Sequence, residues 1–155
     1  QLLKQEALSE PIRQEALYFR AKAHLHDQQY GLAVVDLTPL AKEVRTAIGA
    51  EAKYQLAYAY LQLGSTDLAE QEIMSFTQMQ TSQQYWLAKS MILLADINMQ
   101  RDDLFQAKQY LLALQSNYRQ EDDIQTIIAE KLTTIEEAEN AVIEEENYET
   151  EEESL

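Results

Sequence analysis

The sequence has 155 residues, and 46% of them are hydrophobic, which is enough for one domain with a continuous core. Three Gly and two Pro are too few for a sheet-rich fold with many tight turns, and the remaining composition favours helices. The net charge of -15 argues against a nucleic-acid-binding protein, and the absence of Cys excludes disulfides, thiolate zinc sites and Cys nucleophiles.

Residues 1–10 are helix-like from the first residue, Gln, and we interpret them as the end of a preceding helix within a longer protein. Ser9 and Pro11 then supply the cap and first turn of the next helix. No apolar stretch approaches the roughly 18 residues that a membrane span needs. The sequence therefore predicts no direct membrane insertion.

Three segments, beginning at Glu15, Glu51 and Lys89, repeat one another along the next hundred or so residues. Small residues recur in register at intervals of 36 and 38 residues, and a second set follows the first by twelve positions. The two sets are Ala21, Ala57 and Ala95, and Ala33, Ala69 and Ala107. A small residue at such a position allows two helices to cross closely. The pattern predicts three helix pairs.

Short polar turns are predicted within the pairs at residues 27–30, 64–67 and 101–104. Gly64 can adopt the left-handed conformation that ends a helix. Asp67 and Asp103 are expected to cap the helices that follow. The residues in excess of a 34-residue repeat are expected to lengthen either the second helices or the links between pairs.

Pro39 interrupts the second helix of the first pair, because a proline disfavours helical geometry in the residue before it. Either that helix kinks there or a second short helix starts at Pro39. Trp86, at the start of the third segment, is expected to pack between the second and third pairs.

The last predicted helix, residues 121–143, is capped by Asp122 or Asp123 and closes the hydrophobic face of the last pair. Its apolar stripe consists of Ile124, Ile127, Ile128, Leu132, Ile135 and Val142. Ten Glu and no Lys or Arg occur from Glu136 to the end, so residues 144–155 are predicted to be a disordered acidic tail.

These segments resemble the tetratricopeptide repeat family, whose 34-residue repeat places Leu, a small residue, Tyr, Gly, Ala and a bulky residue at fixed offsets. The middle segment matches with Leu56, Ala57, Tyr60, Gly64, Ala69 and Ile73. The first matches with Leu17, Ala21, Tyr30, Ala33 and Leu37, and the third with Met91, Leu94, Ala95, Ala107 and Leu111. Departures from the pattern are Arg20, His24, Lys53, Asn98 and Asp102.

The resemblance implies an all-α fold, an α-solenoid of antiparallel helix pairs with a C-terminal capping helix. The implied units are 1–10, the repeats 11–48, 49–83 and 84–120, the capping helix 121–143 and the tail 144–155. The third segment also resembles the C-terminal end of large multi-repeat proteins of Bacteroides-type bacteria. Such proteins are often exported, so the resemblance favours a location of this protein in the bacterial cell envelope.

Members of this family bind partners in a concave groove lined by the first helix of each pair. Carried onto this sequence, the groove positions are Tyr18, Lys22, His26, Tyr54, Tyr58, Gln62, Lys89, Ile92 and Asp96. Tyr suits such a surface because it buries a large rigid ring and keeps a polar tip. Alternatively, some of these tyrosines pack between neighbouring repeats. No Lys/Arg cluster of the kind that clamps a C-terminal carboxylate occurs among them.

No catalytic, metal or cofactor site is predicted. His24 and His26 are two residues apart, so they point to different faces of a helix, and the acidic pairs are typical of solvated surface. We therefore expect a non-catalytic scaffold that binds a protein or peptide. Two alternatives remain: a passive or self-assembling segment of a larger protein, which associates through its N-terminal face, and an accessory to an enzyme activity located upstream.

Overall fold

The computed structural model describes residues 9–153, and their side chains except for residue 146 and residues 148–153. This part of the chain consists of helices joined by turns and short links, without a strand, so the all-α prediction is confirmed. The chain divides into two compact units at Ser90/Met91, inside the fifth helix. The helices are α1 (Glu10–His26), α2 (Tyr30–Leu40), α3 (Ala47–Gln62), α4 (Thr66–Gln78), α5 (Gln84–Gln100), α6 (Leu104–Asn117) and α7 (Ile124–Glu153).

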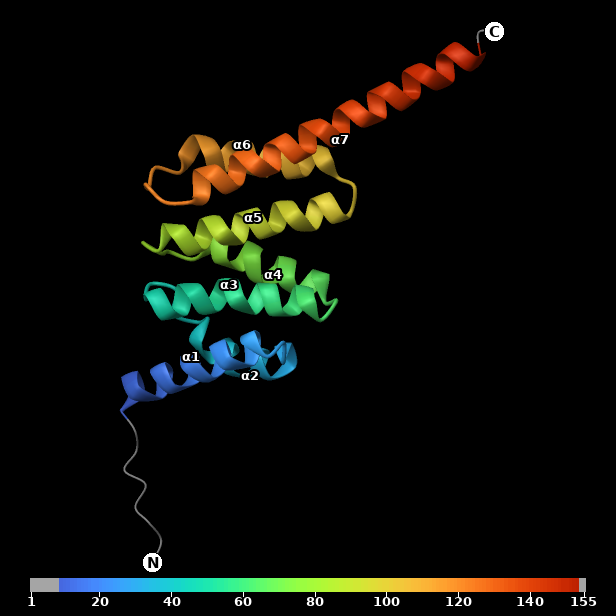
Figure 1. Cartoon of the computed structure of the whole chain (residues 1–155). Helices are drawn as coiled ribbons and strands as arrows, with labels where there is room; N and C mark the ends of the chain where they lie inside the picture. The colour runs from blue at the N-terminus through green and yellow to red at the C-terminus, as the bar shows by residue number, and fades with distance from the viewer. Residues whose placement is uncertain (1–8, 154–155) are drawn as a thin grey trace, which may run out of the picture. The chain divides into compact units, whose positions relative to one another are not determined.

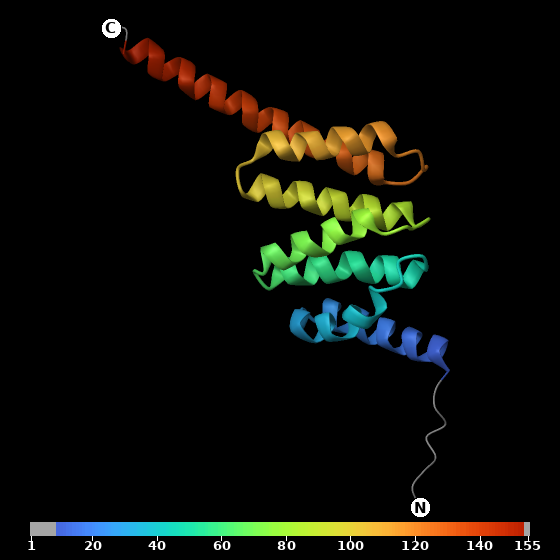
Figure 2. The ribbon, with the colours of Figure 1, turned by 180° about the vertical axis from the view of Figure 1, so that it is seen from behind.

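In the first unit α1 packs against α2, α2 against α3 and α3 against α4, and α1 also contacts α3 (Figures 1 and 2). Its core contains Leu37 and Leu40 of α2 and Leu56 of α3. The six alanines that recur in the sequence are all fully buried. This burial is what close packing of helices at these positions requires.

The three turns within pairs have the same geometry. In each, one residue has a positive φ: Gln28 at 57°, Gly64 at 76° and Asp102 at 60°. Its N–H and that of the following residue bond to carbonyls three and five residues earlier, a Schellman motif. The three left-handed residues are again 36 and 38 positions apart, so the internal repetition extends from sequence to backbone conformation.

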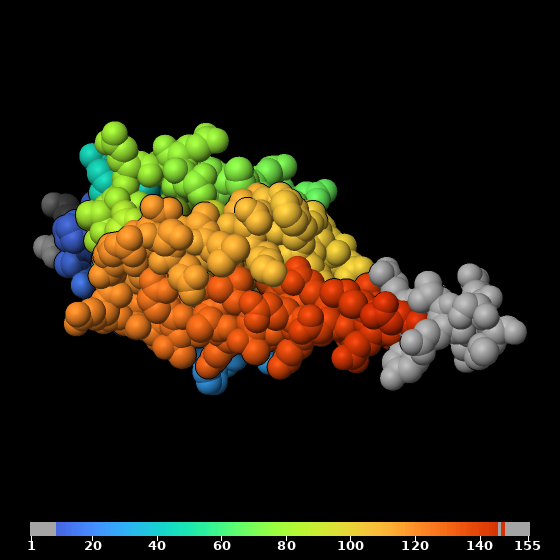
Figure 3. All heavy atoms as spheres, turned by 90° about the horizontal axis from the view of Figure 1, so that it is seen from above, coloured from blue at the N-terminus to red at the C-terminus, as the bar shows by residue number. Residues whose placement is uncertain are grey.

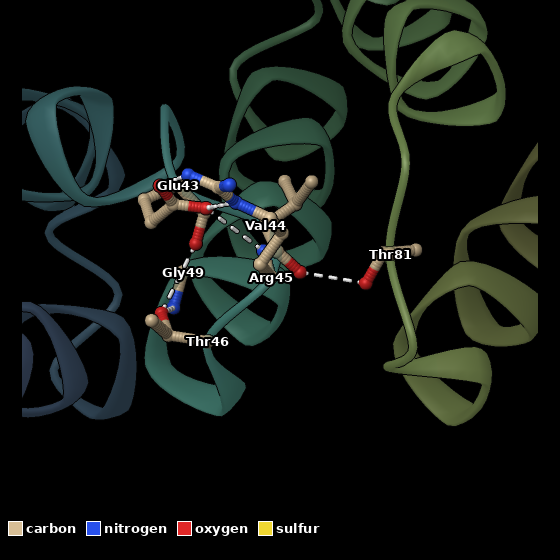
Figure 4. Close-up of polar contacts among 6 residues, drawn as sticks. All are labelled: Glu43, Val44, Arg45, Thr46, Gly49 and Thr81. Atoms are coloured by element: carbon tan, nitrogen blue, oxygen red, sulfur yellow. Dashed lines mark hydrogen bonds and ion pairs between the residues drawn. The ribbon is translucent and has the colours of Figure 1, made fainter.

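The links between pairs, 41–46 and 79–83, are longer than these turns, which accounts for the extra residues. Figure 4 shows how the first link is held. The Thr46 side chain caps α3 by accepting the Gly49 N–H at 3.0 Å, and the Thr81 hydroxyl of the second link donates to the Val44 carbonyl at 2.6 Å. Hydrogen bonds from Arg45 lower the pKa of the exposed Glu43 to about 2.

Of the two alternatives at Pro39, the start of a new helix is wrong, because α2 continues through the proline and ends at Leu40. A proline in the last turn removes only one helical hydrogen bond, and the Thr38 hydroxyl donates to the Val34 carbonyl at 2.6 Å beside it. Asp67 lies inside α4, whose N-cap is Ser65, whereas Asp103 caps α6 as predicted by accepting from the Gln106 N–H at 3.0 Å.

In the second unit α7 packs along α6 and continues beyond it (Figure 3). Ile124, Ile128 and Ile135 of the predicted stripe are fully buried, but Val142 is half exposed. The prediction of a disordered tail from residue 144 is wrong for residues 144–153, because α7 extends to Glu153. Glu is a good helix former, and it extends a helix that the core has already nucleated.

Helices begin at residues 10, 47, 84 and 124, where the predicted units begin at 11, 49, 84 and 121. Residues 1–8, interpreted from sequence as the end of a preceding helix, lie outside the described residues. Ser9 occupies the N-cap position of α1, and Pro11 is in the first turn as predicted.

Candidate partner-binding surface

Seven of the nine predicted groove residues lie in the first unit, and five of these contact groups on neighbouring helices. We call them the tyrosine–lysine row: Tyr18 and Lys22 of α1, Tyr54 and Tyr58 of α3, and Lys89 of α5. Tyr18 and Tyr54 are separated by the 36-residue repeat, so they occupy equivalent helical positions.

Glu51 links α1 to α3 at one end of the row. Its carboxylate accepts hydrogen bonds from the Tyr18 hydroxyl and from Lys22 Nζ, each at 2.7 Å, although only 8% of the residue is exposed. Lys22 Nζ also lies 5.4 Å from the centre of the Tyr18 ring. Burial and the Glu51 hydrogen bond raise the pKa of Tyr18, and the Glu51 hydrogen bond raises that of Lys22. Both side chains are therefore held in place by one buried carboxylate.

Trp86 links α3 to the first part of α5 in the same way. Its ring centre is 5.7 Å from that of Tyr54, and Lys89 Nζ lies 5.5 Å from the Tyr54 ring centre. Trp86 also packs on a core cluster that contains Val44 and Phe76, so it packs between the second and third pairs as predicted. Lys89 and Trp86 of α5 thus both contact the Tyr54 ring, and ring and cation contacts of this kind favour one orientation of it.

Tyr58 contacts α2 rather than a first helix of a pair. Its ring centre is 6.2 Å from that of Tyr30, and burial raises its pKa. The tyrosines thus do both things considered from sequence: they pack between helices, and each keeps part of its surface exposed.

The other predicted groove residues differ in exposure. Gln62 and His26 are exposed, and the His26 ring nitrogen Nδ1 lies 3.1 Å from the Asp27 carboxylate. Ile92, in contrast, is only 5% exposed, which argues against a role in contacting a partner. In the second unit Asp96 accepts a hydrogen bond from Lys131 of α7 at 2.5 Å.

Buried charges explain two departures from the repeat pattern in the first pair. Asp36 of α2 has a side chain that is 3% exposed, and Arg20 binds it in bidentate fashion at 2.6 and 2.8 Å. His24 Nε2 lies 3.7 Å from the same carboxylate. Hydrogen bonds from Arg20 lower the pKa of Asp36, against the effect of burial. Arg20 and His24 therefore replace pattern residues because α2 carries a buried acid.

Lys53, the departure in the middle pair, is also paired. Its Nζ lies 2.6 Å from the Glu72 carboxylate and 3.3 Å from the Ser75 hydroxyl. An open hollow of about 300 Å³ beside it is lined by Thr38, Ala41, Lys42, Lys53, Leu56, Glu72, Ser75 and Met79. Within this hollow the charge of Lys53 is thus already paired with that of Glu72.

Sequence reasoning missed Glu51, Asp36 and Glu72, the acids that hold these cations. The only signal was indirect: Arg20, His24 and Lys53 were conspicuous as departures from the repeat pattern. Among the described side chains no group of three His, Cys, Asp or Glu is arranged to hold a metal ion. None of the described helices is both long enough and apolar enough to cross a bilayer.

Comparison with known proteins gives no assignment. No family model, curated protein or solved structure matches this chain.

Proposed function

We propose that the chain is a segment of a tetratricopeptide-like α-solenoid built from antiparallel helix pairs. Three turns with one hydrogen-bonding pattern, at intervals of 36 and 38 residues, support this proposal. So do the fully buried alanines at the same intervals. An unrelated helical bundle has no reason to repeat both features in register.

We further propose that the segment is a non-catalytic scaffold that binds a protein or peptide on the tyrosine–lysine row. The observation that carries this proposal is the pre-ordering of the row by Glu51 and Trp86. Partly exposed rings that are already held lose little conformational entropy on binding, and they present large apolar faces with polar tips. Lys22 and Lys89 add donors for carbonyl or carboxylate groups of an extended peptide.

The test is selection of binders from a random peptide display library with the whole chain as bait. We expect selected peptides to lose at least about tenfold in affinity for the Tyr54→Ala/Tyr58→Ala variant, which removes two contact rings. Leu68→Ala/Met74→Ala is the matched control, because both residues are similarly exposed apolar positions on α4. Peptides that bind both variants equally would contradict the row as the binding surface.

A passive structural segment is the second candidate. This candidate is favoured by the contacts that row residues make with neighbouring helices. These contacts stabilise the packing of the helices without any binding partner. Selection of no specific peptide, together with an undiminished yield of folded protein, would favour it over the scaffold.

A further inference from the structure

The tyrosine–lysine row carries two ring platforms, one repeat apart. The first is Tyr18 on α1, and the second is Tyr54 on α3 with Trp86 of α5 packed against it. All three rings are partly exposed. Tyr18 and Tyr54 are 36 positions apart, so they occupy the same place on the first helices of successive pairs. The row therefore offers flat apolar faces at a repeated interval.

This interval matches the turn of a polyproline II helix. Helices α1 and α3 are in contact, and packed helices lie about 8–10 Å apart. A polyproline II helix has three residues per turn and rises about 3.1 Å per residue, which gives about 9 Å per turn. Side chains three residues apart in such a ligand can therefore reach successive platforms. Aromatic-lined surfaces are the kind that proline-rich segments bind.

The polar groups of the row match the same ligand. Proline has no N–H, so a proline-rich backbone offers carbonyl acceptors and few donors. Lys22, Lys89 and Trp86 bring ammonium and indole N–H groups to the row, and these groups only donate. The Glu51 carboxylate is 8% exposed and already accepts from Tyr18 and Lys22. The row thus favours a ligand that accepts hydrogen bonds over one that donates them.

The charges of the row give the ligand a direction. Lys22 Nζ lies 2.7 Å from the Glu51 carboxylate, so the lysine charge on α1 is already offset. Lys89 Nζ lies 5.5 Å from the centre of the Tyr54 ring, and none of the described side chains supplies a carboxylate to it. An acidic residue of the ligand therefore complements the row at Lys89, beyond the Tyr54 platform.

We infer that the row binds an extended, proline-rich segment of another protein, with prolines three residues apart and an acidic residue at the end that reaches Lys89. This inference rests on the proposed function and narrows its partner class. A polyproline II segment is already extended before it binds, so ordering it costs little conformational entropy.

The first experiment uses Trp86 as its reporter, because it is the only tryptophan of the chain. Nonaproline followed by two aspartates is titrated into the whole chain at physiological ionic strength, which screens the acidic remainder of the chain. Tryptophan fluorescence reports binding, and calorimetry gives the dissociation constant. We expect the dissociation constant to rise at least about tenfold when alanines replace the prolines, and likewise in Tyr54→Ala.

Two variants serve as controls for the loss of the ring. Tyr54→Phe keeps the ring and should retain the affinity, which guards against a loss of binding through misfolding. Tyr110→Ala on α6 should also retain it, because Tyr110 is partly exposed but lies outside the row.

The direction of the ligand is tested at its acidic end. Replacing the two aspartates by asparagines should weaken binding about threefold, the effect of one exposed ion pair. This difference should disappear in Lys89→Gln but persist in Lys42→Gln, since Lys42 is an exposed lysine of the same unit outside the row. A difference that persists in Lys89→Gln would overturn the assigned direction.

The inference is overturned if the alanine peptide binds as tightly as the proline peptide, or if Tyr54→Ala leaves proline binding intact. Peptides from the display library that need Tyr54 and Tyr58 but lack regularly spaced prolines would also overturn it, and they would leave the scaffold function standing. If no peptide of either kind depends on the row, both the inference and the proposed scaffold function fail.

Discussion

The carbonyl of Glu43 lies directly over the α-carbon of Gly49, so closely that an added β-carbon would be 1.9 Å from the carbonyl oxygen. The same carbonyl accepts the Thr46 hydroxyl at 3.0 Å, and Thr46 in turn caps α3 through the Gly49 N–H. The link from α2 to α3 is thus folded tightly onto the first turn of α3, and only glycine leaves room for it (Figure 4).

Gly49→Ala should therefore lower the free energy of unfolding by about 2–3 kcal/mol, as overpacking against a backbone atom does. Chemical denaturation followed by circular dichroism measures the change. Gly31→Ala is the control, because a β-carbon there meets nothing within 4 Å and alanine favours helix; we expect it to stabilise by about 0.5 kcal/mol. Equal effects at both glycines would contradict the close approach.

At the three turn residues with a positive φ, introducing glycine should stabilise the chain and removing glycine should destabilise it. Gln28→Gly and Asp102→Gly should each raise the free energy of unfolding by about 0.5–1 kcal/mol, because glycine has no β-carbon to strain a positive φ. Gly64→Ala should lower it by about 1 kcal/mol for the same reason. Thermal denaturation of the three variants checks the signs, and a stabilising Gly64→Ala would refute the shared turn geometry.

We expect the folded chain to lose stability in acid because Asp36 becomes protonated. Its pKa in the folded chain is lowered, chiefly by hydrogen bonds from Arg20, below the 3.8 of an unperturbed Asp. The Arg20–Asp36 pair therefore contributes stability above about pH 4, and the contribution is lost as the pH falls through the folded pKa. Arg20→Ala should destabilise the chain at pH 7, and its effect should disappear as the pH falls through the folded pKa of Asp36.

Urea denaturation at several pH values follows this difference. Arg45→Ala is a suitable control, because its partner Glu43 is exposed and a surface pair contributes little. An Arg20→Ala penalty as small as that of Arg45→Ala would show that the burial of Asp36 does not matter.

The two ends of α7 should respond differently to truncation of side chains. Ile135→Ala removes a fully buried side chain and should cost about 3 kcal/mol in free energy of unfolding. Val142→Ala should cost less than about 0.5 kcal/mol, since Val142 is 52% exposed. Similar penalties at both positions would mean that the core along α7 extends further than Ile135.

Positions that depend on local sequence were predictable. The recurring alanines and the polar turns follow from repeat spacing and turn chemistry, and both appear at the expected residues. The partners of Arg20 and Lys53 were not predictable, because Asp36 and Glu72 lie 16 and 19 residues further along the chain on other helices. The repeat spacing predicts which residues share one face of a helix. It does not predict which acidic side chain forms an ion pair with a given Arg or Lys.

The length of α7 was missed for a different reason. The predicted end of the helix was placed where the apolar stripe ends, at Val142, whereas the buried core already ends near Ile135. Beyond it the helix depends on propensity and on its own hydrogen bonds, which leave no periodic signal in a run of glutamates.

Packing between helices that are adjacent along the chain has a consequence for how the protein folds. In the first unit α1 contacts α2, α2 contacts α3 and α3 contacts α4, so few of these interactions require distant parts of the chain to meet. Little loop-closure entropy is lost before the first favourable contacts form, and chains of this kind fold quickly. A helix pair can form early and serve as the template on which its neighbour assembles, so folding can spread from more than one starting point.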